Sequence, residues 1–148
     1  MKLKYSFFLI LIVTILGWNF YNCCEENNVE INERNFLVNN ERYFIKGVCY
    51  DPVPLGYKKR SFDKIDEDLK LMVEAGVNTI RVYSPIDDIS ILDKIDKAGI
   101  KIIVGFGYNQ DGYYDILSGS FENYIKKYKN HNAILFWELG NEYNYHAE

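Results

Sequence analysis

Apolar positions follow two different periods along most of the chain. Short runs dominated by apolar and β-branched residues predict strands over residues 43–50, 77–83, 100–106 and 133–138. Between these runs, apolar residues recur at three- and four-residue spacing, which predicts three helices with one buried face each. The residues expected on those faces are Ile65, Leu69, Met72 and Val73, then Ile91, Leu92, Ile95 and Ala98, and finally Phe121, Tyr124, Ile125 and Tyr128.

The ends of the predicted helices carry recognisable signals. Ser61 is expected to cap the first helix, and Asp87 or Asp88 the second. The same helix-to-strand connection occurs twice, in Glu74-Ala75-Gly76-Val77 and in Lys97-Ala98-Gly99-Ile100. In each segment a helix is expected to end at Ala-Gly, and a strand follows at once. This weak internal repeat indicates successive βα units.

The residues before the first long strand predict a hairpin and a tether. Phe36-Leu37-Val38 and Tyr43-Phe44-Ile45 flank turn-forming residues, so the hairpin's second run is expected to continue as the first long strand through Tyr50. Residues 23–35 are mostly polar and are interpreted as a tether.

The N-terminal segment has the pattern of an export signal. Lys2 and Lys4 precede a near-continuous apolar run over residues 7–16, so residues 1–22 are interpreted as a signal peptide or lipoprotein signal. Phe20-Tyr21-Asn22-Cys23 resembles a relaxed lipobox, which makes Cys23 the candidate for lipidation. The expected location is outside the cytoplasm, secreted or membrane-anchored; an uncleaved signal anchor is the alternative.

Four strands separated by helices require right-handed crossovers and a mainly parallel sheet. Both a doubly wound sheet and a (β/α)₈ barrel satisfy that requirement. The first strand is followed by Tyr50-Asp51-Pro52-Val53-Pro54 instead of a Gly-rich phosphate turn, which argues against a nucleotide-binding fold.

Composition narrows the possible partners. The net charge of −4 is spread along the chain without a basic block, which argues against nucleic acid. Thirteen Tyr and nine Phe suit a sugar-binding surface, and ordinary core and surface packing accounts for them equally well. The three cysteines lack the spacing of a disulfide framework, and Cys49 is expected to be a buried thiol in a strand. Neither a cofactor nor a metal site is indicated.

The residues from Ile134 to Glu142, with Tyr128-Lys129-Asn130-His131 before them, resemble the fourth-strand signature of a clan of retaining (β/α)₈-barrel glycoside hydrolases. That clan includes the β-galactosidase and β-glucuronidase barrels, the cellulases and mannanases, and the β-1,3-glucanosyltransferases. Residues 43–48 are similar to the first barrel strand of these enzymes, and residues 75–82 to the second.

The resemblance implies an α/β fold for residues 36–148: a partial TIM (β/α)₈ barrel of about four βα units, preceded by a short β-hairpin. It implies that Glu142 is the catalytic acid/base, that Asn141 hydrogen-bonds the sugar 2-hydroxyl, and that Arg81 lies beside the nucleophile. Such enzymes hold two carboxyl groups roughly 5 Å apart at the ends of barrel strands. The acid/base must be protonated when substrate arrives.

Other residues lie where barrel active sites are built. Tyr50, Asp51, Tyr83 and Tyr108 stand at or beyond the predicted strand ends, and both sugar contact and rim packing remain open for them. His146 follows the Asn-Glu pair and is either a substrate contact or an ordinary exposed histidine.

Three residues near the motif are given structural roles. Glu138 is expected between the sheet and the helices with a basic partner, and not as a catalytic group. His131 is expected to fix the loop before the fourth strand, and Trp137 to lie in the core.

The expected function is hydrolysis of O-glycosyl bonds in a β-glycoside or β-glycan. A whole barrel takes about 250 residues, and the resemblance places the nucleophile on strand seven, so the chain is expected to be truncated and to lack that residue. Two alternatives stay open: a non-catalytic glycan-binding surface lipoprotein, and one half of a two-chain enzyme whose second chain completes the barrel. An oligo- or polysaccharide is the expected partner.

Overall fold

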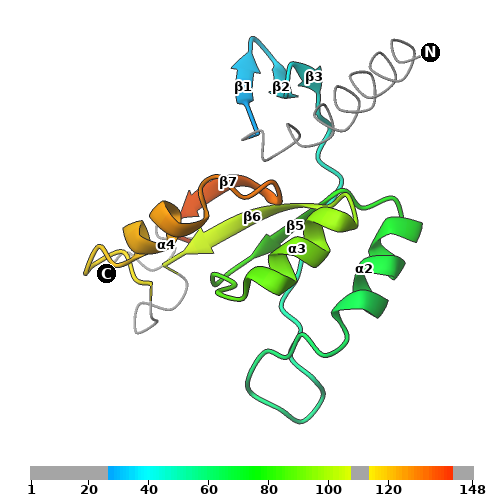
Figure 1. The fold of residues 1–148 in the computed structure, drawn as a ribbon, viewed down its shortest axis with the longest axis vertical. Coiled ribbons are helices and arrows are strands. Elements are labelled where there is room, and N and C mark those ends of the chain that lie inside the picture. The colour runs from blue at the N-terminus through cyan, green and yellow to red at the C-terminus, as the bar shows by residue number, and fades with distance from the viewer. Residues whose placement is uncertain (1–26, 108–113, 142–148) are drawn as a thin grey trace, which may run out of the picture.

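The computed structural model describes residues 27–107 and 114–141, which form two sheets and three helices (Figure 1). A three-stranded antiparallel meander has the order β1-β2-β3, and a four-stranded parallel sheet has the order β4-β5-β6-β7. The meander strands are β1 (Val29–Asn32), β2 (Asn35–Val38) and β3 (Glu41–Arg42). The parallel strands are β4 (Gly47–Cys49), β5 (Thr79–Val82), β6 (Lys101–Phe106) and β7 (Ile134–Leu139). The helices are α2 (Ile65–Glu74), α3 (Ile89–Lys97) and α4 (Phe121–Tyr128).

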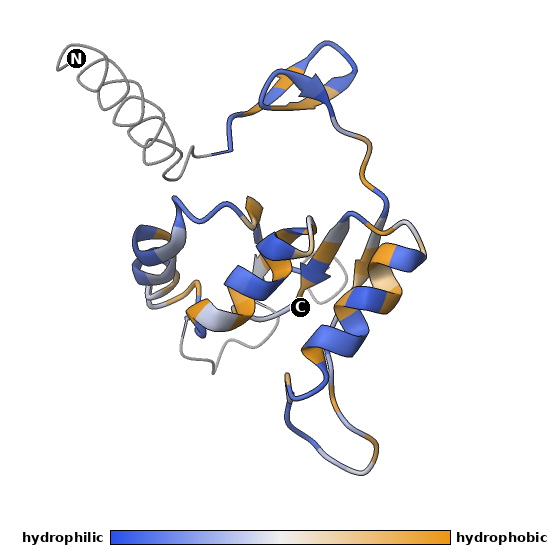
Figure 2. Cartoon of the chain, turned by 45° about the vertical axis from the view of Figure 1, so that its right-hand side comes forward, coloured by the Kyte–Doolittle hydropathy of each residue, from blue (hydrophilic) through white to orange (hydrophobic). Residues whose placement is uncertain are grey.

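The core lies between the parallel sheet and the three helices. Ile80, Val82, Ile102 and Val104 alternate along β5 and β6 and are buried against residues of α2, α3 and α4. Figure 2 shows the matching stripes of apolar and polar residues on α2 and α3. All three helices therefore cover one face of the sheet, as in a barrel wall, and the other face carries Arg81 and its neighbours. These four parallel strands and the three helices between them confirm the predicted partial barrel.

The helix ends follow the sequence signals in part. Asp88 caps α3, since its carboxylate accepts a hydrogen bond from the Ser90 backbone N–H at 2.9 Å. Gly99 follows this helix with φ 73°, as expected of a glycine terminator. The prediction that Ser61 caps α2 is wrong. A turn closed by the Ile65 N–H and the Phe62 carbonyl separates Ser61 from the helix.

A strand lies before the predicted hairpin. Residues 29–32 were expected to belong to a tether and instead form β1. The predicted hairpin is present: β2 and β3 are joined by Asn39 and Asn40, both with positive φ, as a tight hairpin turn requires.

The predicted single strand over residues 43–50 is wrong, because β3 ends at Arg42 and β4 begins at Gly47. The side chain of Asn78 accounts for the break. Its Oδ1 accepts from the Lys46 N–H at 2.8 Å and its Nδ2 donates to the Phe44 carbonyl at 2.9 Å. These contacts satisfy backbone groups that a continuous strand would have paired with a neighbouring strand.

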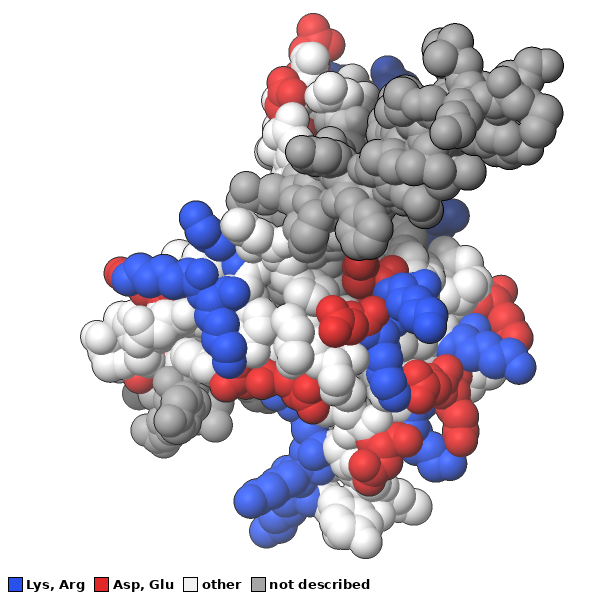
Figure 3. All heavy atoms as spheres, in the orientation of Figure 1, with Lys and Arg blue, Asp and Glu red and all other residues white. Residues whose placement is uncertain are grey.

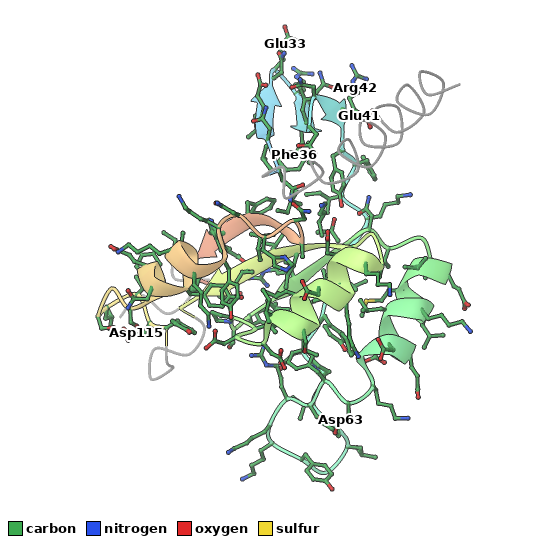
Figure 4. All side chains as sticks on the ribbon, viewed as in Figure 1. Glu33, Phe36, Glu41, Arg42, Asp63 and Asp115 are labelled. Carbon is green, nitrogen blue, oxygen red and sulfur yellow. The ribbon has the colours of Figure 1, made fainter. Side chains whose placement is uncertain are left out.

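The meander is attached at the end of the parallel sheet where the strands begin. The Tyr43 hydroxyl donates to the Asn78 carbonyl at 2.8 Å, and Asn27 Nδ2 donates to the Ile134 carbonyl at 2.8 Å. The Phe36 ring packs edge-on against Phe136, with centroids 6.0 Å apart; Figure 4 shows Phe36 on the side of the meander that faces the parallel sheet. The meander therefore lies at the end opposite to the one where the parallel strands finish.

Asp87 joins the loop after β5 to helix α4 and the segment before it. Its carboxylate accepts hydrogen bonds from Lys127 Nζ at 2.8 Å, from the Tyr128 hydroxyl at 2.7 Å and from the Tyr114 hydroxyl at 2.8 Å. The hydrogen bond from Lys127 has the largest effect on Asp87, and the hydrogen bond from Tyr128 the next largest. Together they hold the pKa of Asp87 below its ordinary value of 3.8.

Replacing Asp87 by asparagine is expected to lower the free energy of unfolding by about 1 kcal/mol, because an amide keeps only part of this network and the site is partly exposed. Since the folded pKa is depressed, the stabilisation is present above pH 3.8 and is lost as the pH falls through the folded value. Urea unfolding from pH 7 to pH 2.5 should show the difference between the two proteins shrinking at low pH. Asp63→Asn, at an exposed position, is the matched control, and equal losses in both variants would contradict the role of Asp87.

Within the described ranges, none of the helices has the length and apolar character needed to cross a membrane. The predicted signal over residues 1–22 and the lipidation candidate Cys23 lie outside the described residues.

Candidate functional site

Two side chains of opposite charge meet on the face of the parallel sheet that the helices leave open. Arg81 lies in β5 between buried Ile80 and Val82, so its side chain points away from the helices. Glu138 follows Trp137, whose ring packs on the helix side near Tyr124, so the Glu138 side chain also leaves on the open face. Arg81 Nε donates to Glu138 Oε2 at 2.6 Å and Nη2 donates to Oε1 at 2.7 Å.

The pair is held in a half-buried setting. The side chains of Arg81 and Glu138 are 24% and 31% exposed, and the two hydrogen bonds form the fork geometry that favours arginine over lysine. The hydrogen bonds to Glu138 raise the pKa of Arg81 above its ordinary value, so the guanidinium is permanently charged. The basic partner expected for Glu138 is thus present. The expected location between sheet and helices is wrong, because alternation along β7 turns this residue the other way.

The bridge crosses the strand between its two partners. β6 lies between β5 and β7, and Gly105 is the residue of β6 paired with Glu138. A Cβ atom on Gly105 would lie 2.8 Å from the Val82 carbonyl oxygen, closer than side-chain atoms pack. Gly105 therefore allows close approach of the strands and puts no side chain between the charged partners.

Asn141 joins the same group from the residues after β7. The Gly140 N–H donates to the Phe106 carbonyl at 2.8 Å, and Gly140 has φ 92°, which turns the chain out of the strand. Arg81 Nη2 donates to Asn141 Oδ1 at 2.9 Å. The structure therefore brings together Arg81 and Asn141, two of the three residues to which a catalytic role was assigned. The third, Glu142, follows directly in the chain and lies outside the described residues.

Two further side chains border the guanidinium of Arg81. The Tyr83 ring lies under it, with 4.5 Å between the guanidinium carbon and the ring centroid. Cys49 Sγ is 4.0 Å from Arg81 Nη1, and a hydrogen bond with Cys49 raises the pKa of Tyr83. Tyr83 is thus located beside the residues of the motif, as its position at a strand end suggested.

Cys49 was expected to be buried, and this prediction is wrong because its side chain is exposed. Cys49 pairs with Arg81 in the register of β4 and β5, which places both on the open face. Sequence reasoning therefore missed Cys49 as a neighbour of the site. The signal that could have found it is its position at the end of the first parallel strand, where barrel active sites are built.

The structure does not bring Tyr50 to this group. Its ring is buried in the core, 8% exposed, and its hydroxyl donates to Asp68 Oδ2 of α2 at 2.7 Å. Because successive residues of a strand face opposite ways, Tyr50 is turned toward the helices and Cys49 toward the open face. The assignment of Tyr50 as a substrate contact is therefore corrected to a core role.

Asp51 is exposed in the loop after β4. It lies near Arg60, whose pKa is lowered by burial, with Asp51 acting in the opposite direction. Arg60 donates to the Ser84 and Pro85 carbonyls at 2.7 Å each, which ties this loop to the loop after β5. The remaining candidates, Tyr108 and His146, lie outside the described residues.

Two structural expectations near the motif are confirmed. The imidazole of His131 accepts from the Ala133 N–H at 3.1 Å and contacts Asp93 at 3.1 Å, which fixes the loop before β7. Trp137 packs against the core beside Phe106 and Tyr124.

The electrostatic result is a nearly neutral cluster. Glu138 balances the charge of Arg81, whose Nη1 contacts Cys49 Sγ and whose guanidinium also interacts with Tyr83. The guanidinium and the Asn141 amide carry hydrogen-bond donors that suit an oxygen-rich ligand or another carboxylate. On the face shown in Figure 3, charged side chains of both signs are interleaved.

Comparison with known proteins identifies similar barrels. Residues 29–148 match the family model for glycosyl hydrolases family 2, TIM barrel domain. The chain is 29% identical over 131 residues to a β-galactosidase of Arthrobacter sp. (strain B7), an alignment that covers 77% of this chain and 13% of the relative. It is 32% identical over 126 residues to a β-glucuronidase of Bacteroides fragilis, covering 74% of this chain and 18% of the relative. The chain thus spans less than a fifth of the length of these curated relatives.

Solved structures agree in fold. A β-glucuronidase of Parabacteroides merdae with glycerol in its active site matches with a TM-score of 0.61 and 25% identity, over 80% of this chain and 16% of that one. A GH2 β-galacturonidase of Eisenbergiella tayi bound to galacturonate matches with a TM-score of 0.63 and 22% identity, over 78% and 23% of the two chains. With four parallel strands, one helix-covered face and a family model that extends over residues 29–148, this chain belongs to glycosyl hydrolase family 2, within its TIM barrel domain.

Proposed function

We propose that this chain supplies the acid/base half of the active site of a retaining glycoside hydrolase that acts on β-glycosides. The observation that carries the proposal is the hydrogen bond between Arg81 and Asn141 at the end of the sheet where the parallel strands finish, directly before Glu142 in the chain. This contact connects the end of the second parallel strand with the Asn-Glu pair that follows the fourth, as a barrel active site requires.

In this proposal Glu142 works twice. Protonated, it gives a proton to the leaving oxygen while a second carboxylate attacks the sugar carbon; ionised, it then removes a proton from the water that releases the sugar. Asn141 and Arg81 hold the sugar and the charged groups in place. The relatives named as β-galactosidase and β-glucuronidase support a β-linked sugar as the substrate class.

The second carboxylate is expected from polypeptide outside these 148 residues. β4 and β7 are the two edges of the described parallel sheet, and Val48 on β4 and Leu139 on β7 are 42% and 59% exposed. Such edges bind further strands readily. Additional βα units, in continuity with this chain or in a second one, would cover these edges and bring a carboxylate within roughly 5 Å of Glu142.

We further propose that residues 1–22 direct export of the protein, with Cys23 as the site of a lipid anchor. The support is the sequence pattern of Lys2, Lys4 and the apolar run that follows. An extracytoplasmic glycosidase would meet oligo- or polysaccharides directly. Metabolic labelling with a radioactive fatty acid tests the anchor; labelling of the wild type that persists in Cys23→Ala would contradict Cys23 as its site.

The stereochemistry of the reaction tests the enzymatic proposal. The chain is combined with the polypeptide that supplies the remaining four βα units, and 4-nitrophenyl β-galactoside and β-glucuronide are offered as substrates. Turnover is expected, with the β anomer as the first product in proton NMR spectra recorded before mutarotation. An α anomer as the first product would contradict the retaining mechanism. Oligosaccharide binding without turnover would instead identify a glycan-binding protein.

A further inference from the structure

We propose that Glu138 is a positioning residue: through Arg81, it fixes the side-chain amide of Asn141 so that the amide NH₂ group is the part offered to the sugar. The inference rests on the proposed glycosidase function. Glu138 lies in β7, the strand before the Asn-Glu pair, and its carboxylate is on the same face of the sheet as Arg81. In this proposal it takes no part in proton transfer.

The orientation of the Asn141 amide follows from the chemistry of its partner. A guanidinium group donates hydrogen bonds and accepts none, so the Asn141 atom 2.9 Å from Arg81 Nη2 must be the carbonyl oxygen Oδ1. Within residues 27–107 and 114–141, the structure shows no hydrogen bond from Nδ2 of Asn141. Arg81 therefore determines which end of the amide is left for a ligand.

Arg81 can do this only while its own plane is fixed. Glu138 takes the Nε and Nη2 edge of the guanidinium through two short hydrogen bonds, and the Tyr83 ring packs against its face. Nη2 is shared between Glu138 and Asn141, so the carboxylate and the amide oxygen define the direction of the same nitrogen. Loss of the Glu138 charge would free Arg81 to rotate, and the Asn141 amide could then turn over at little cost.

The arrangement selects a class of ligand group. An NH₂ donor beside a positively charged guanidinium favours an oxygen acceptor, such as a sugar hydroxyl, and disfavours an ammonium group, which has no acceptor. The position contacted by Asn141 should therefore carry a hydroxyl in the preferred substrate. An amino sugar bearing a free ammonium group at that position should bind poorly.

The first test uses nitrogen-15 NMR on the full chain without substrate. In the wild type, the Arg81 Nε–H and the two Asn141 Nδ2–H signals are expected to be resolved and slow to exchange. Glu138→Gln keeps the size of the side chain and removes its charge. In this variant the Arg81 Nε–H proton should exchange with solvent about tenfold faster or more, and the chemical shifts of the Asn141 Nδ2–H signals should change. Glu122→Gln, at an exposed pair with Lys126, is the matched control and should leave both unchanged. Unchanged Arg81 and Asn141 signals in folded Glu138→Gln would overturn the proposal.

Glu138→Asp keeps the charge and provides a second test if the glutamine variant does not fold. A shorter carboxylate is expected to retain one of the two hydrogen bonds, so exchange of the Arg81 signal should be intermediate. The same signals in Glu138→Asp as in the wild type would show that the carboxylate position does not control Arg81.

The second test measures kcat/KM of the assembled enzyme for a series of aryl β-glycosides, each of which lacks one sugar hydroxyl. In the wild type, removal of the hydroxyl contacted by Asn141 should reduce kcat/KM by about tenfold relative to the parent sugar, as loss of one hydrogen bond predicts. In Glu138→Gln this particular penalty should shrink to about twofold, and the penalties for the other hydroxyls should stay the same. Equal slowing of all substrates would indicate a merely structural role and overturn the inference. Because wild-type turnover is measured in the same series, this result is distinguishable from failure of the proposed function.

Discussion

Glu142→Gln is expected to slow hydrolysis of phenyl β-glycosides by the assembled enzyme by about 10²–10⁴-fold, the usual contribution of general acid–base catalysis. Phenol is a poor leaving group that must receive a proton as the glycosidic bond breaks. Glutamine has nearly the same size as glutamate and has no proton of suitable acidity to give. Initial rates for purified wild type and variant, at equal concentrations of folded protein, provide the measurement.

A leaving group that needs no proton separates this role from a general loss of structure. With 2,4-dinitrophenyl β-glycosides, the step that forms the glycosyl–enzyme should be almost as fast in Glu142→Gln as in the wild type. Glu122→Gln, on the exposed face of α4, is the control and should behave like the wild type with both substrates. Equal slowing with both leaving groups would rule out Glu142 as the acid.

Gly105→Ala is expected to lower the free energy of unfolding by about 2–3 kcal/mol, because the new methyl group would lie 2.8 Å from the Val82 carbonyl oxygen. The obstacle is backbone on a neighbouring strand and cannot move as a side-chain tip can. Separation of β5 from β6 should also disturb the bridge between Arg81 and Glu138, since that bridge crosses β6 at this position. Urea unfolding measures the first effect, and the Arg81 Nε–H signal measures the second.

Gly56→Ala provides a comparison in which the same methyl group meets no atom within 4 Å. Gly56 has φ 84°, so alanine there should cost about 1 kcal/mol through backbone strain alone. The Arg81 signal should be unaffected in this variant. If Gly105→Ala destabilised the protein no more than Gly56→Ala, the close approach at Gly105 would not be a constraint on the fold.

The resemblance to retaining glycoside hydrolases singled out Arg81 and Asn141, because the motifs that carry it are local in the sequence. Arg81 lies in a strand that follows an Ala-Gly helix terminator, and Asn141 follows a strand of almost entirely apolar residues. The pairing of Arg81 with Glu138 was not predictable in the same way. The two residues are 57 positions apart and lie on strands separated by β6, so their contact depends on the order and register of three strands.

The first strand shows how a small shift changes the assignment of a site. The sequence pattern predicted a buried Cys49 and placed Tyr50 at the end of the strand among the possible sugar contacts. In the structure the Cys49 side chain is exposed and the Tyr50 ring is buried in the core. In a strand, successive side chains face opposite ways, so assignment to a face requires knowledge of the phase. The phase of β4 is set by its pairing with β5 and by the hydrogen bond from Tyr50 to Asp68 on α2.

The amino-acid sequence alone determined the succession of βα units, the helix terminators at Gly76 and Gly99 and the turn at Asn39-Asn40. These features depend on periodicity and backbone preference, which act between residues close in the chain. The resemblance to retaining glycosidases was visible in the sequence as well, because the motifs that carry it are short and continuous. The tertiary structure alone decided that the meander packs at the end where the strands begin, that Cys49 faces the site and that Glu138 holds Arg81. These outcomes arise from contacts between distant segments, whose geometry exists only once the strands have assembled in order and in register.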